Sequence, residues 1–553
     1  MEPTVAEVLT WTQQYMPFGG SYLLPALVAA VPLIILFIML AVMRKPGHQA
    51  AFISTAAAIL LSIFVWGMPT KLAINATLFG TAFGLFPIVW IVITAIWIYN
   101  MTVESGEFEI IKNSLASITE DRRLQAIFIA FAFGSFIEGT AGFGTPVAIT
   151  AAMLVGLGFN PLYAAGICLI ANTAPVAFGA IGIPIVVAAK VTDIDMNHIS
   201  AIVGRQLPFL SVLVPLWLSV TMSGFKRSME ILPAILVAGV SFAGTQFVMS
   251  NFHGPYLPDI ASSIVTIVAL GAFLKVWKPK HVWHFADEPA SACTVTKCDY
   301  SMGEVLRAWM PYIILAFMVL LWGLEPVKKV LDSFVQFKIQ WPGLHDLVIK
   351  TAPIVAKDTP YGAVFNLNLL SAGGTAILFS GLLSVLIIPG YSLGKAFACL
   401  GRTTYQLRYP IVTIAMILGL AMIMNYSGMS STLGLAFTAT GSWFPFFAPI
   451  LGWLGVFLTG SDTSSNALFG ALQKTTAQQI GVDPALCVAA NSSGGVTGKM
   501  ISPQSISVAT AASNMVGREG DIFRFTLKHS LAMLAFVCCL TMLQAYVLHW
   551  MLP

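Results

Sequence analysis

Hydrophobic residues run through this chain in fourteen long stretches separated by short polar segments. Most stretches have about 20 residues, the length that an α-helix needs to cross the hydrocarbon core of a bilayer. They cover residues 21–43, 50–68, 78–103, 124–158, 162–190, 206–224, 229–248, 257–275, 305–323, 371–390, 409–427, 442–470, 484–510 and 529–550. The pattern predicts an all-α polytopic membrane protein.

Two of these stretches, 124–158 and 442–470, are too long and too polar at their centres to be simple spans. Their centres, Glu138–Pro146 and Gly460–Asn466, combine Gly, Ser and Thr with one acid each. We expect two re-entrant hairpins, each made of two half-helices that enter and leave the membrane on the same side. The other stretches then form about twelve full spans. A pair of ordinary kinked helices is the alternative.

The positive charges favour the hairpins. With Arg44 and Lys45 on the cytoplasmic side, both termini and the long loop 324–370 lie on the periplasmic side. The loops then expected inside are 104–123, 225–228, 276–304, 391–408 and 511–528. Counted with their edges, the inner segments hold 18 of the 28 Lys and Arg residues, 8 lie outside and 2 lie within membrane segments. Cytoplasmic loops normally carry such an excess, whereas treating either hairpin as one span would misplace the basic loop 511–528.

The chain also contains an internal repeat. Seven short matches recur in order at an offset of 319 to 323 over about 100 residues. The matched positions are Pro87 and Pro410, Ser105-Gly106 and Ser427-Gly428, Gly134–Gly139 and Gly455–Gly460, Asn160-Pro161 and Asp483-Pro484, Ala171–Thr173 and Ala490–Ser492, Gly179 and Gly498, and Pro184 and Pro503. The expected topology runs the two copies in opposite directions across the membrane. Inverted repeats are typical of secondary transporters, whose site lies at the repeat interface.

The repeats divide the chain into five parts. Scaffold spans occupy residues 1–76, repeat 1 occupies 77–205, and repeat 2 occupies 409–528. Middle spans with the loops 276–304 and 324–370 fill 206–408, and a last span follows at 529–553.

Each repeat is expected to add a broken span to its hairpin. The breaks are predicted at Asn172–Pro175 and at Asn491–Gly495, because proline interrupts helical hydrogen bonding and glycine lets the chain turn. Half-helix N-termini would then direct free N–H groups and partial positive charge into a cavity near the midplane, which favours an anion. Tight helix packing is the alternative explanation for the small residues in these segments, and it applies equally well to Gly142, Gly144 and Gly156.

The candidate substrate-binding residues follow from this arrangement. They are Thr140, Gly142, Gly144, Thr145, Asn172, Thr173, Ser461, Thr463, Ser464, Ser465, Asn466, Asn491, Ser492, Ser493 and Lys499.

Three charges lie deep in the predicted membrane segments: Glu138, Asp462 and Lys499. A charge at the bilayer centre costs on the order of 3 kcal/mol, so each one needs a function or a partner. Glu138 and Asp462 are candidate proton carriers, although Asp462 could instead cap the half-helix that begins near Ser464. Lys499 is a candidate counter-charge for an anionic substrate, with an ion pair to Asp462 as the alternative.

Composition narrows the function further. The chain is 57% hydrophobic and only 9% charged, whereas soluble domains carry about 25% charged residues. A soluble enzyme, a nucleic-acid-binding protein and a disordered scaffold are therefore excluded, and no cofactor is expected. P-loop, HExxH and nucleophile-elbow patterns are absent from the sequence. His281, His284, Cys293 and Cys298 are the weak candidates for a metal site, which we do not expect to form.

Several long motifs resemble the bacterial lactate permease family over essentially the whole chain. They are Ile137–Ile149, Leu162–Gly166, Asn172–Gly179, Gly204–Pro208, Phe457–Phe469 and Gly498–Ser505. The resemblance implies a multi-pass inner-membrane symporter that couples protons to L-lactate, D-lactate or glycolate. It also implies an ion-transporter-superfamily architecture with hairpins in a moving domain. The expected partners are the substrate, H⁺ and lipid, and a homodimer is left open.

Two alternatives remain at this point. Oxygen-rich Asn, Thr and Ser loops can also bind Na⁺, so a sodium-coupled carboxylate symporter is the second hypothesis. A membrane-embedded enzyme or receptor is the third, but the sequence shows neither a nucleophile–base pair nor a sensing domain.

Overall fold

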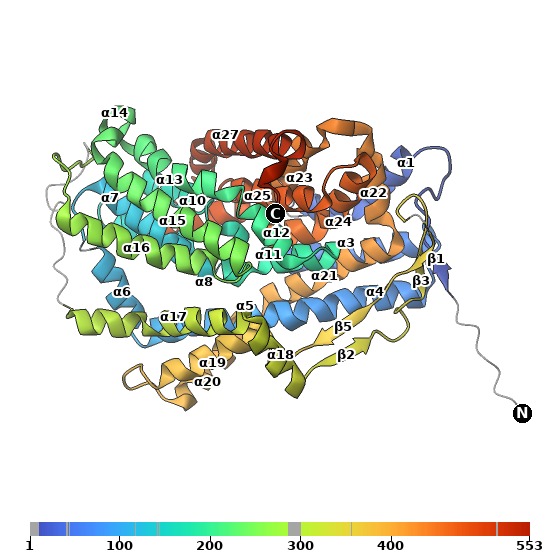
Figure 1. Ribbon diagram of the computed structural model, residues 1–553, viewed down its shortest axis with the longest axis horizontal. Coiled ribbons are helices and arrows are strands. Elements are labelled where there is room, and N and C mark those ends of the chain that lie inside the picture. Colours follow the sequence, from blue (N-terminus) through green and yellow to red (C-terminus); the bar gives the residue numbers. More distant parts are fainter. Residues whose placement is uncertain are drawn as a thin grey trace, which may run out of the picture.

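The computed structural model describes residues 10–39, 43, 45–116, 118–140, 142, 144–285, 300–355, 357–515 and 518–553. Figure 1 shows an elongated bundle in which most long helices lie along the longest axis. The short helices α6, α7 and α14 lie at one end of that axis, and strands β1 and β3 lie at the other.

The described elements are mostly helical. Up to residue 203 they are β1 (Trp11–Thr12), α1 (Leu23–Ala29), α2 (Val31–Phe37), α3 (Gly47–Phe64), α4 (Thr70–Phe83), η2 (Gly84–Val89), α5 (Trp90–Glu104), α6 (Glu107–Ala116), α7 (Arg122–Ala126), η3 (Ile127–Phe133), α8 (Gly134–Thr140), α9 (Thr145–Gly156), α10 (Pro161–Ala171), η4 (Val176–Phe178), α11 (Gly179–Thr192) and α12 (Met196–Val203).

The middle of the chain contains the other four strands. Its elements are α13 (Leu207–Ser223), α14 (Phe225–Ser228), η5 (Met229–Ile231), α15 (Leu232–Phe252), α16 (Pro258–Val276), α17 (Met302–Gly323), α18 (Glu325–Phe334), β2 (Phe337–Gln340), β3 (Val348–Lys350), β4 (Thr359–Pro360), β5 (Val364–Leu367), α19 (Gly373–Val385) and α20 (Leu393–Gln406).

The last third is helical again. It contains α21 (Arg408–Ser427), α22 (Met429–Phe437), η7 (Thr438–Trp443), α23 (Phe444–Thr459), α24 (Asp462–Ile480), α25 (Pro484–Lys499), α26 (Pro503–Ala512), α27 (Glu519–Tyr546) and η8 (His549–Met551).

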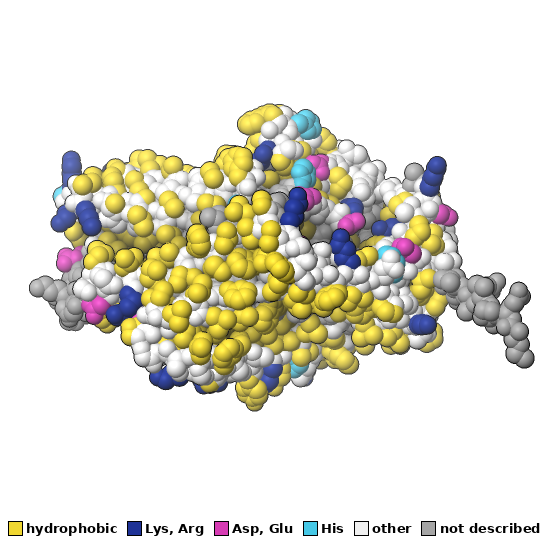
Figure 2. All heavy atoms as spheres, turned by 60° about the horizontal axis from the view of Figure 1, so that its bottom comes forward, with side chains coloured by type: hydrophobic (Ala, Val, Ile, Leu, Met, Phe, Trp, Pro, Cys, Tyr) yellow, Lys and Arg dark blue, Asp and Glu magenta, His cyan; other side chains and the backbone are white. Residues whose placement is uncertain are grey.

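The protein is a polytopic membrane protein. Among the described residues, nine helical segments are long and apolar enough to cross a membrane, and ten if the bent pair α10–α11 counts as one span. Other expected spans correspond to shorter helices: α1 with α2, α19, and α25 with α26. Figure 2 shows hydrophobic side chains over a broad continuous area of one face, with charged side chains set around it. Such a surface suits contact with lipid.

Strands from distant parts of the chain form two small sheets. β1 pairs in parallel with β3, with Trp11 opposite Val348, and β3 pairs antiparallel with β4. β2 and β5 form a separate antiparallel ribbon. The N-terminal segment is therefore attached to the loop 324–370 at the end of the molecule that carries the strands (Figure 1).

Matching caps begin one helix in each predicted repeat. The Asn160 side chain accepts a hydrogen bond from the Leu162 N–H, and the Asp483 side chain accepts one from the Ala485 N–H. In both cases proline occupies the first helical position, where its missing N–H costs nothing. The sequence match Asn160-Pro161 and Asp483-Pro484 thus corresponds to the same local structure.

Candidate functional site

The stretch 124–158 forms a helical hairpin. Its first leg comprises α7, η3 and α8, and its second leg is α9. The chain turns at Gly142 and Gly144, whose φ angles are +61° and +82°, a conformation that glycine adopts without steric cost. A Cβ at Gly134 would lie 3.5 Å from the Thr150 side chain, so the two legs are side by side.

The stretch 442–470 forms a second hairpin from α23 and α24. Ser465 Oγ donates to the Gly452 carbonyl at 3.0 Å, and Gln473 Nε2 donates to the Ala448 carbonyl at 2.9 Å. These contacts join residues on opposite sides of the turn at Gly460, and the pair farther from the turn on one leg is also farther on the other, as antiparallel legs require. Both stretches therefore fold back on themselves.

The first predicted break is confirmed. α10 ends at Ala171, and α10 and the segment Val176–Thr192 are bent by 62° relative to each other. Beyond the break, Ala180 and Ile181 adopt φ angles of +45° and +59°. Such left-handed residues cost roughly 1–2 kcal/mol each when they carry a side chain, so tertiary packing must hold this turn in place.

The second break is not at Asn491–Gly495, and that prediction was wrong. α25 continues through these residues to Lys499, and the interruption is at Met500–Ser502. Gly494 and Gly498 instead let α25 approach α23, because a Cβ at either would overlap the backbone of Pro449 or Trp453. Here the glycines serve close packing, which was the alternative reading of these small residues.

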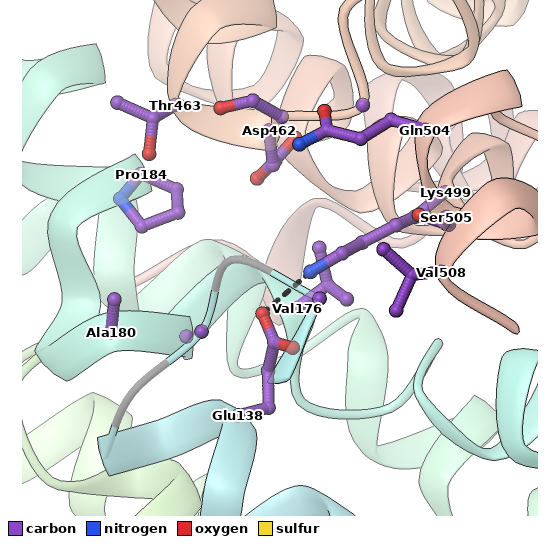
Figure 3. A pocket seen from close by; sticks show the side chains of 15 residues that line it. Glu138, Val176, Ala180, Pro184, Asp462, Thr463, Lys499, Gln504, Ser505 and Val508 are labelled. Carbon is purple, nitrogen blue, oxygen red and sulfur yellow. Dashed lines mark hydrogen bonds and ion pairs between the residues drawn. The ribbon is translucent and has the colours of Figure 1, made fainter. Parts of the chain in front are cut away.

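The two hairpin turns and the two breaks surround one cavity (Figure 3). It encloses about 570 Å³ of space between atoms, including the part open to solvent. Its lining residues are Glu138, Gly142, Gly144, Val176, Gly179, Ala180, Pro184, Gly460, Ser461, Asp462, Thr463, Lys499, Gln504, Ser505 and Val508. Every lining residue comes from the predicted repeats, so the cavity lies at their interface.

An ion pair crosses this cavity. Lys499 Nζ, at the end of α25, donates to Glu138 Oε1 of α8 at 2.6 Å, and both side chains are less than one-tenth exposed. Glu138 Oε2 has no hydrogen-bond partner among the described residues. Removing two charges from water costs more than an average pair returns, so stability alone does not explain this pair.

The second acid is held separately. Ser492 Oγ of α25 donates to Asp462 Oδ2 at the start of α24, while Oδ1 has no partner among the described residues. The cap of α24 is Ser461, whose side chain accepts from the Ser464 N–H. Asp462 is thus neither the cap of α24 nor the partner of Lys499.

Glycines make room for both carboxylates. A Cβ at Gly179 would lie 2.7 Å from Glu138 Oε1, and a Cβ at Gly495 would overlap Asp462 Oδ1. Glu138 therefore packs against the backbone at the start of α11, and Asp462 packs against the backbone of α25.

Seven of the seventeen predicted site residues line the cavity, and an eighth, Ser492, bonds directly to one of them. The seven are Glu138, Gly142, Gly144, Ser461, Asp462, Thr463 and Lys499. The predicted residues outside the lining are Thr140, Thr145, Asn172, Thr173, Ser464, Ser465, Asn466, Asn491 and Ser493.

Several of these outer residues have structural partners. Asn491 Nδ2 donates to Asn466 Oδ1 at 2.9 Å, and its Oδ1 accepts from Gln473 Nε2. Asn466 Nδ2 donates to the Pro184 carbonyl, which ties the second hairpin to α11. Thr140 Oγ1 bonds back to the Phe136 carbonyl within its own helix. These side chains position the cavity wall without facing the cavity.

Asn172 and Thr173 differ from that group. Both are buried, and the side-chain N and O atoms of both have no hydrogen-bond partner among the described residues. Their place at the first break is as predicted, but they are not among the residues that line the cavity.

Gln504 and Ser505, in the first turn of α26, line the cavity but were not among the predicted site residues. The signal was Ser502-Pro503, because serine at the cap followed by proline at the first helical position is typical of a helix start. The structure has that start, with Ser502 Oγ accepting from the Ser505 N–H.

Asp259 of α16 is a further buried acid that was not among the predicted charges. It is 1% exposed, and its Cβ lies 2.8 Å from the Cβ position of Gly139.

The metal candidates are not gathered into a site among the described residues, which contain no group of three or more His, Cys, Asp or Glu that could hold a metal ion. His281 and His284 are within the described part. Cys293 and Cys298 lie outside it.

Comparison with known proteins identifies relatives over the full length. The sequence model of the family described as L-lactate permease matches residues 25–548. The chain is 54% identical to the glycolate permease GlcA of Escherichia coli (strain K12), over 99% of this chain and 100% of that protein. It is 50% identical to the L-lactate permease of Bacillus subtilis (strain 168), with the same coverage, and to that of Escherichia coli (strain K12), over 98% of this chain and all of that protein.

Among solved structures, the Alcanivorax borkumensis YdaH transporter is similar with a TM-score of 0.45 and 14% identity, over 88% of this chain and 89% of that one. The Neisseria gonorrhoeae MtrF structure gives the same TM-score at 13% identity, over 88% of this chain and 85% of that one. Likeness at this level supports no further argument.

Proposed function

Because the chain belongs to the L-lactate permease family, we propose that it takes up 2-hydroxymonocarboxylates together with protons across the bacterial inner membrane. L-lactate, D-lactate and glycolate are the proposed substrates, since the relatives are named for lactate and glycolate. The chain is a permease and not an enzyme, and the reaction is secondary transport.

The observation that carries this proposal is the buried Lys499–Glu138 pair inside a cavity between two helix breaks. Lys499 is the only cation that lines this cavity among the described residues. A substrate carboxylate that enters must therefore compete with Glu138 for the same ammonium group. One cation suits one carboxylate, which favours monocarboxylates over dicarboxylates.

Competition for Lys499 provides a coupling mechanism. When Glu138 takes up a proton, its carboxyl group no longer needs the ammonium, and the substrate carboxylate can replace it. When the proton leaves, Glu138 reclaims Lys499 and expels the substrate. The summed charge of Lys499, Glu138 and the substrate carboxylate is then the same with and without cargo, so the buried ammonium group always has an anionic partner.

The substrate hydroxyl would be recognised by uncharged groups on the cavity wall. Thr463, Gln504 and Ser505 line it and can donate or accept hydrogen bonds. A site built to bond a hydroxyl rejects the analogue that lacks one, because its own polar groups are left unpaired. Lactate and glycolate should therefore compete strongly, propionate and acetate weakly, and succinate hardly at all.

The proposed topology has about twelve spans, two re-entrant hairpins and inverted repeats, with both termini in the periplasm. The antiparallel legs of both hairpins and the matched caps at Asn160 and Asp483 support it. So does the separation in Figure 1, where α6 and α14, from loops expected inside, lie at the opposite end from β1 and β3, from segments expected outside.

Sodium coupling is the second candidate. It is favoured by the oxygen atoms of Ser461, Asp462 and Thr463, which all line the cavity at one hairpin turn. Hydroxyl and carboxylate oxygens of this kind can ligate a small hard cation.

Uptake of labelled lactate into proteoliposomes separates the candidates. An inward pH gradient without sodium should drive accumulation, and glycolate but not succinate should compete. Accumulation that requires a sodium gradient and ignores the pH gradient would contradict proton coupling. Counterflow of labelled lactate in liposomes without an ion gradient tests whether the protein is a carrier. A membrane-embedded enzyme or receptor would show no counterflow.

A further inference from the structure

A second cavity lies away from the Lys499–Glu138 pair. It encloses about 630 Å³ of space between atoms, including its open part. We call it the outer cavity, and we call the cavity that contains the Lys499–Glu138 pair the central cavity. The outer cavity is lined by Gln13, Val191, Thr192, Asp193, Lys350, Ile354, Val355, Tyr361, Asn425, Ser431, Ala471, Lys474, Thr475 and Gln478. None of these residues lines the central cavity.

Two helices connect the cavities. α11 contributes Pro184 to the central cavity and Val191 and Thr192 to the outer cavity. α24 contributes Asp462 to the central cavity and Lys474 to the outer one, and these residues are separated by roughly 18 Å of helix at 1.5 Å per residue. A ligand in the outer cavity is therefore close to the route along α11 and α24 into the central site.

The outer cavity is positively charged. Lys350, Lys474 and Asp193 are its charged lining residues. Neither Lys350 nor Lys474 forms a salt bridge within the described part of the chain, so no carboxylate oxygen there lies within 4.0 Å of either ammonium group. Two ammonium groups without a carboxylate partner leave room for an anion.

The lysines have unused donors. Lys474 Nζ donates to the Thr192 carbonyl at the end of α11. Lys350 Nζ lies 3.5 Å from the centre of the Tyr361 ring, a cation–π contact that leaves its N–H groups free to bond elsewhere. Tyr361 is itself stacked on Tyr426 at 4.1 Å, so the platform under Lys350 is rigid.

The two ammonium groups also repel each other. Burial and the charge of Lys474 lower the pKa of Lys350 to about 8, and Asp193 acts in the opposite direction. Lys350 is therefore still mostly protonated at neutral pH. An anion between the lysines would relieve the repulsion.

A buried acceptor completes the cavity. Asn425 is 6% exposed and lines it, and its Oδ1 atom has no hydrogen-bond partner among the described residues. Its Nδ2 is already engaged with the Val191 carbonyl, and Gln13 Nε2 bonds the Asn425 carbonyl. The orphaned oxygen can accept a hydrogen bond from a ligand hydroxyl, which a simple inorganic anion lacks.

We propose that the outer cavity is a second binding site for small 2-hydroxycarboxylates, with Lys350 and Lys474 on the carboxylate and Asn425 Oδ1 on the hydroxyl. On the expected topology it opens to the periplasm and collects substrate before the central cavity does. The identity of the ligand rests on the proposed function, whereas the anionic chemistry rests on the lysines alone.

Transport kinetics provide the first test. In right-side-out vesicles, Lys350→Met and Lys474→Met should each raise the KM for external lactate about fivefold or more, with a much smaller change in maximal rate. Lys350→Arg keeps the charge and should stay near the original KM. Lys190→Met is the matched control, since Lys190 Nζ lies over the Phe79 and Phe83 rings and is not part of the cavity lining.

The kinetic outcomes are decisive. An unchanged KM in both lysine-to-methionine variants would overturn the proposal. An equal rise in Lys190→Met would also overturn it, because the effect would then come from general surface charge.

Binding stoichiometry provides the second test. Calorimetry on the purified protein should detect two lactate sites per chain, one lost in Lys350→Met/Lys474→Met and the other in Lys499→Met. A single site lost only in Lys499→Met would overturn the outer site and leave the proposed function standing. Absence of both binding and uptake would overturn both. Displacement from the outer site by sulfate as effectively as by glycolate would overturn its assignment to hydroxy acids.

Discussion

At the residue scale, the central cavity is characterised by a buried ion pair and one further acid. Glu138, Asp462 and Lys499 were singled out because charge at membrane depth is costly, and all three line the central cavity. Lys499 was expected to balance the charge of an anionic substrate, with an ion pair to Asp462 as the alternative. Lys499 pairs instead with Glu138, 361 positions away. The pairing depends on where α25 ends, and that end was predicted in the wrong place.

The same scale yields a prediction for Lys499→Met. The substitution should abolish uptake of every carboxylate and lower the amount of folded protein, because an unpaired buried charge costs about 3–5 kcal/mol. Adding Glu138→Gln should restore the folded amount without restoring uptake of the anion. Fluorescence-detected size-exclusion chromatography and uptake assays measure the two effects. Normal lactate uptake in Lys499→Met would contradict the role of this lysine.

At the element scale, helices and breaks were predicted with unequal success. Pro175 follows Asn172 at a true break, because proline cannot continue the helical hydrogen bonds. Asn491–Gly495 contains glycine without proline, and glycine is compatible with an unbroken helix where another helix packs closely against it. Sequence alone does not distinguish a glycine that turns the chain from one that admits a neighbour, because the difference lies in α23.

Close packing of α23 on α25 gives the prediction for this scale. Gly494→Ala should destabilise the purified protein strongly, because the new methyl group overlaps the Pro449 backbone, which cannot move aside easily. Gly244→Ala in α15 is the control: no atom lies within 4 Å of its Cβ position, and stability should stay equal or rise by up to about 1 kcal/mol. Thermal unfolding in detergent measures both. Equal melting temperatures for the two variants would show that the α23–α25 contact is not tight.

At the scale of the whole molecule, periodicity, charge and the repeat predicted a membrane bundle with two hairpins. They did not predict the outer cavity, because its walls come from β3, α11, α21 and α24, which meet only in the folded chain. The strands of the loop 324–370 were not predicted either. Short strands such as β4 (Thr359–Pro360) have too few residues for a period-two pattern to be visible.

The orientation of the bundle is testable by cysteine labelling in intact cells. Gln336→Cys, in the loop expected outside, should react with a membrane-impermeant maleimide. Gly520→Cys, in the loop expected inside, should react only after lysis. Both positions are exposed, and the unsubstituted chain provides the baseline. Labelling of Gly520→Cys in intact cells would invert the proposed topology.

The central claim is that a proton on Glu138 frees Lys499 for the substrate carboxylate. The most direct test is transport by Glu138→Gln in proteoliposomes, because glutamine is permanently uncharged and cannot carry the proton. Exchange of labelled for unlabelled lactate should persist and be nearly independent of pH, while accumulation driven by a pH gradient should be lost. Full pH-driven accumulation by Glu138→Gln would contradict the claim.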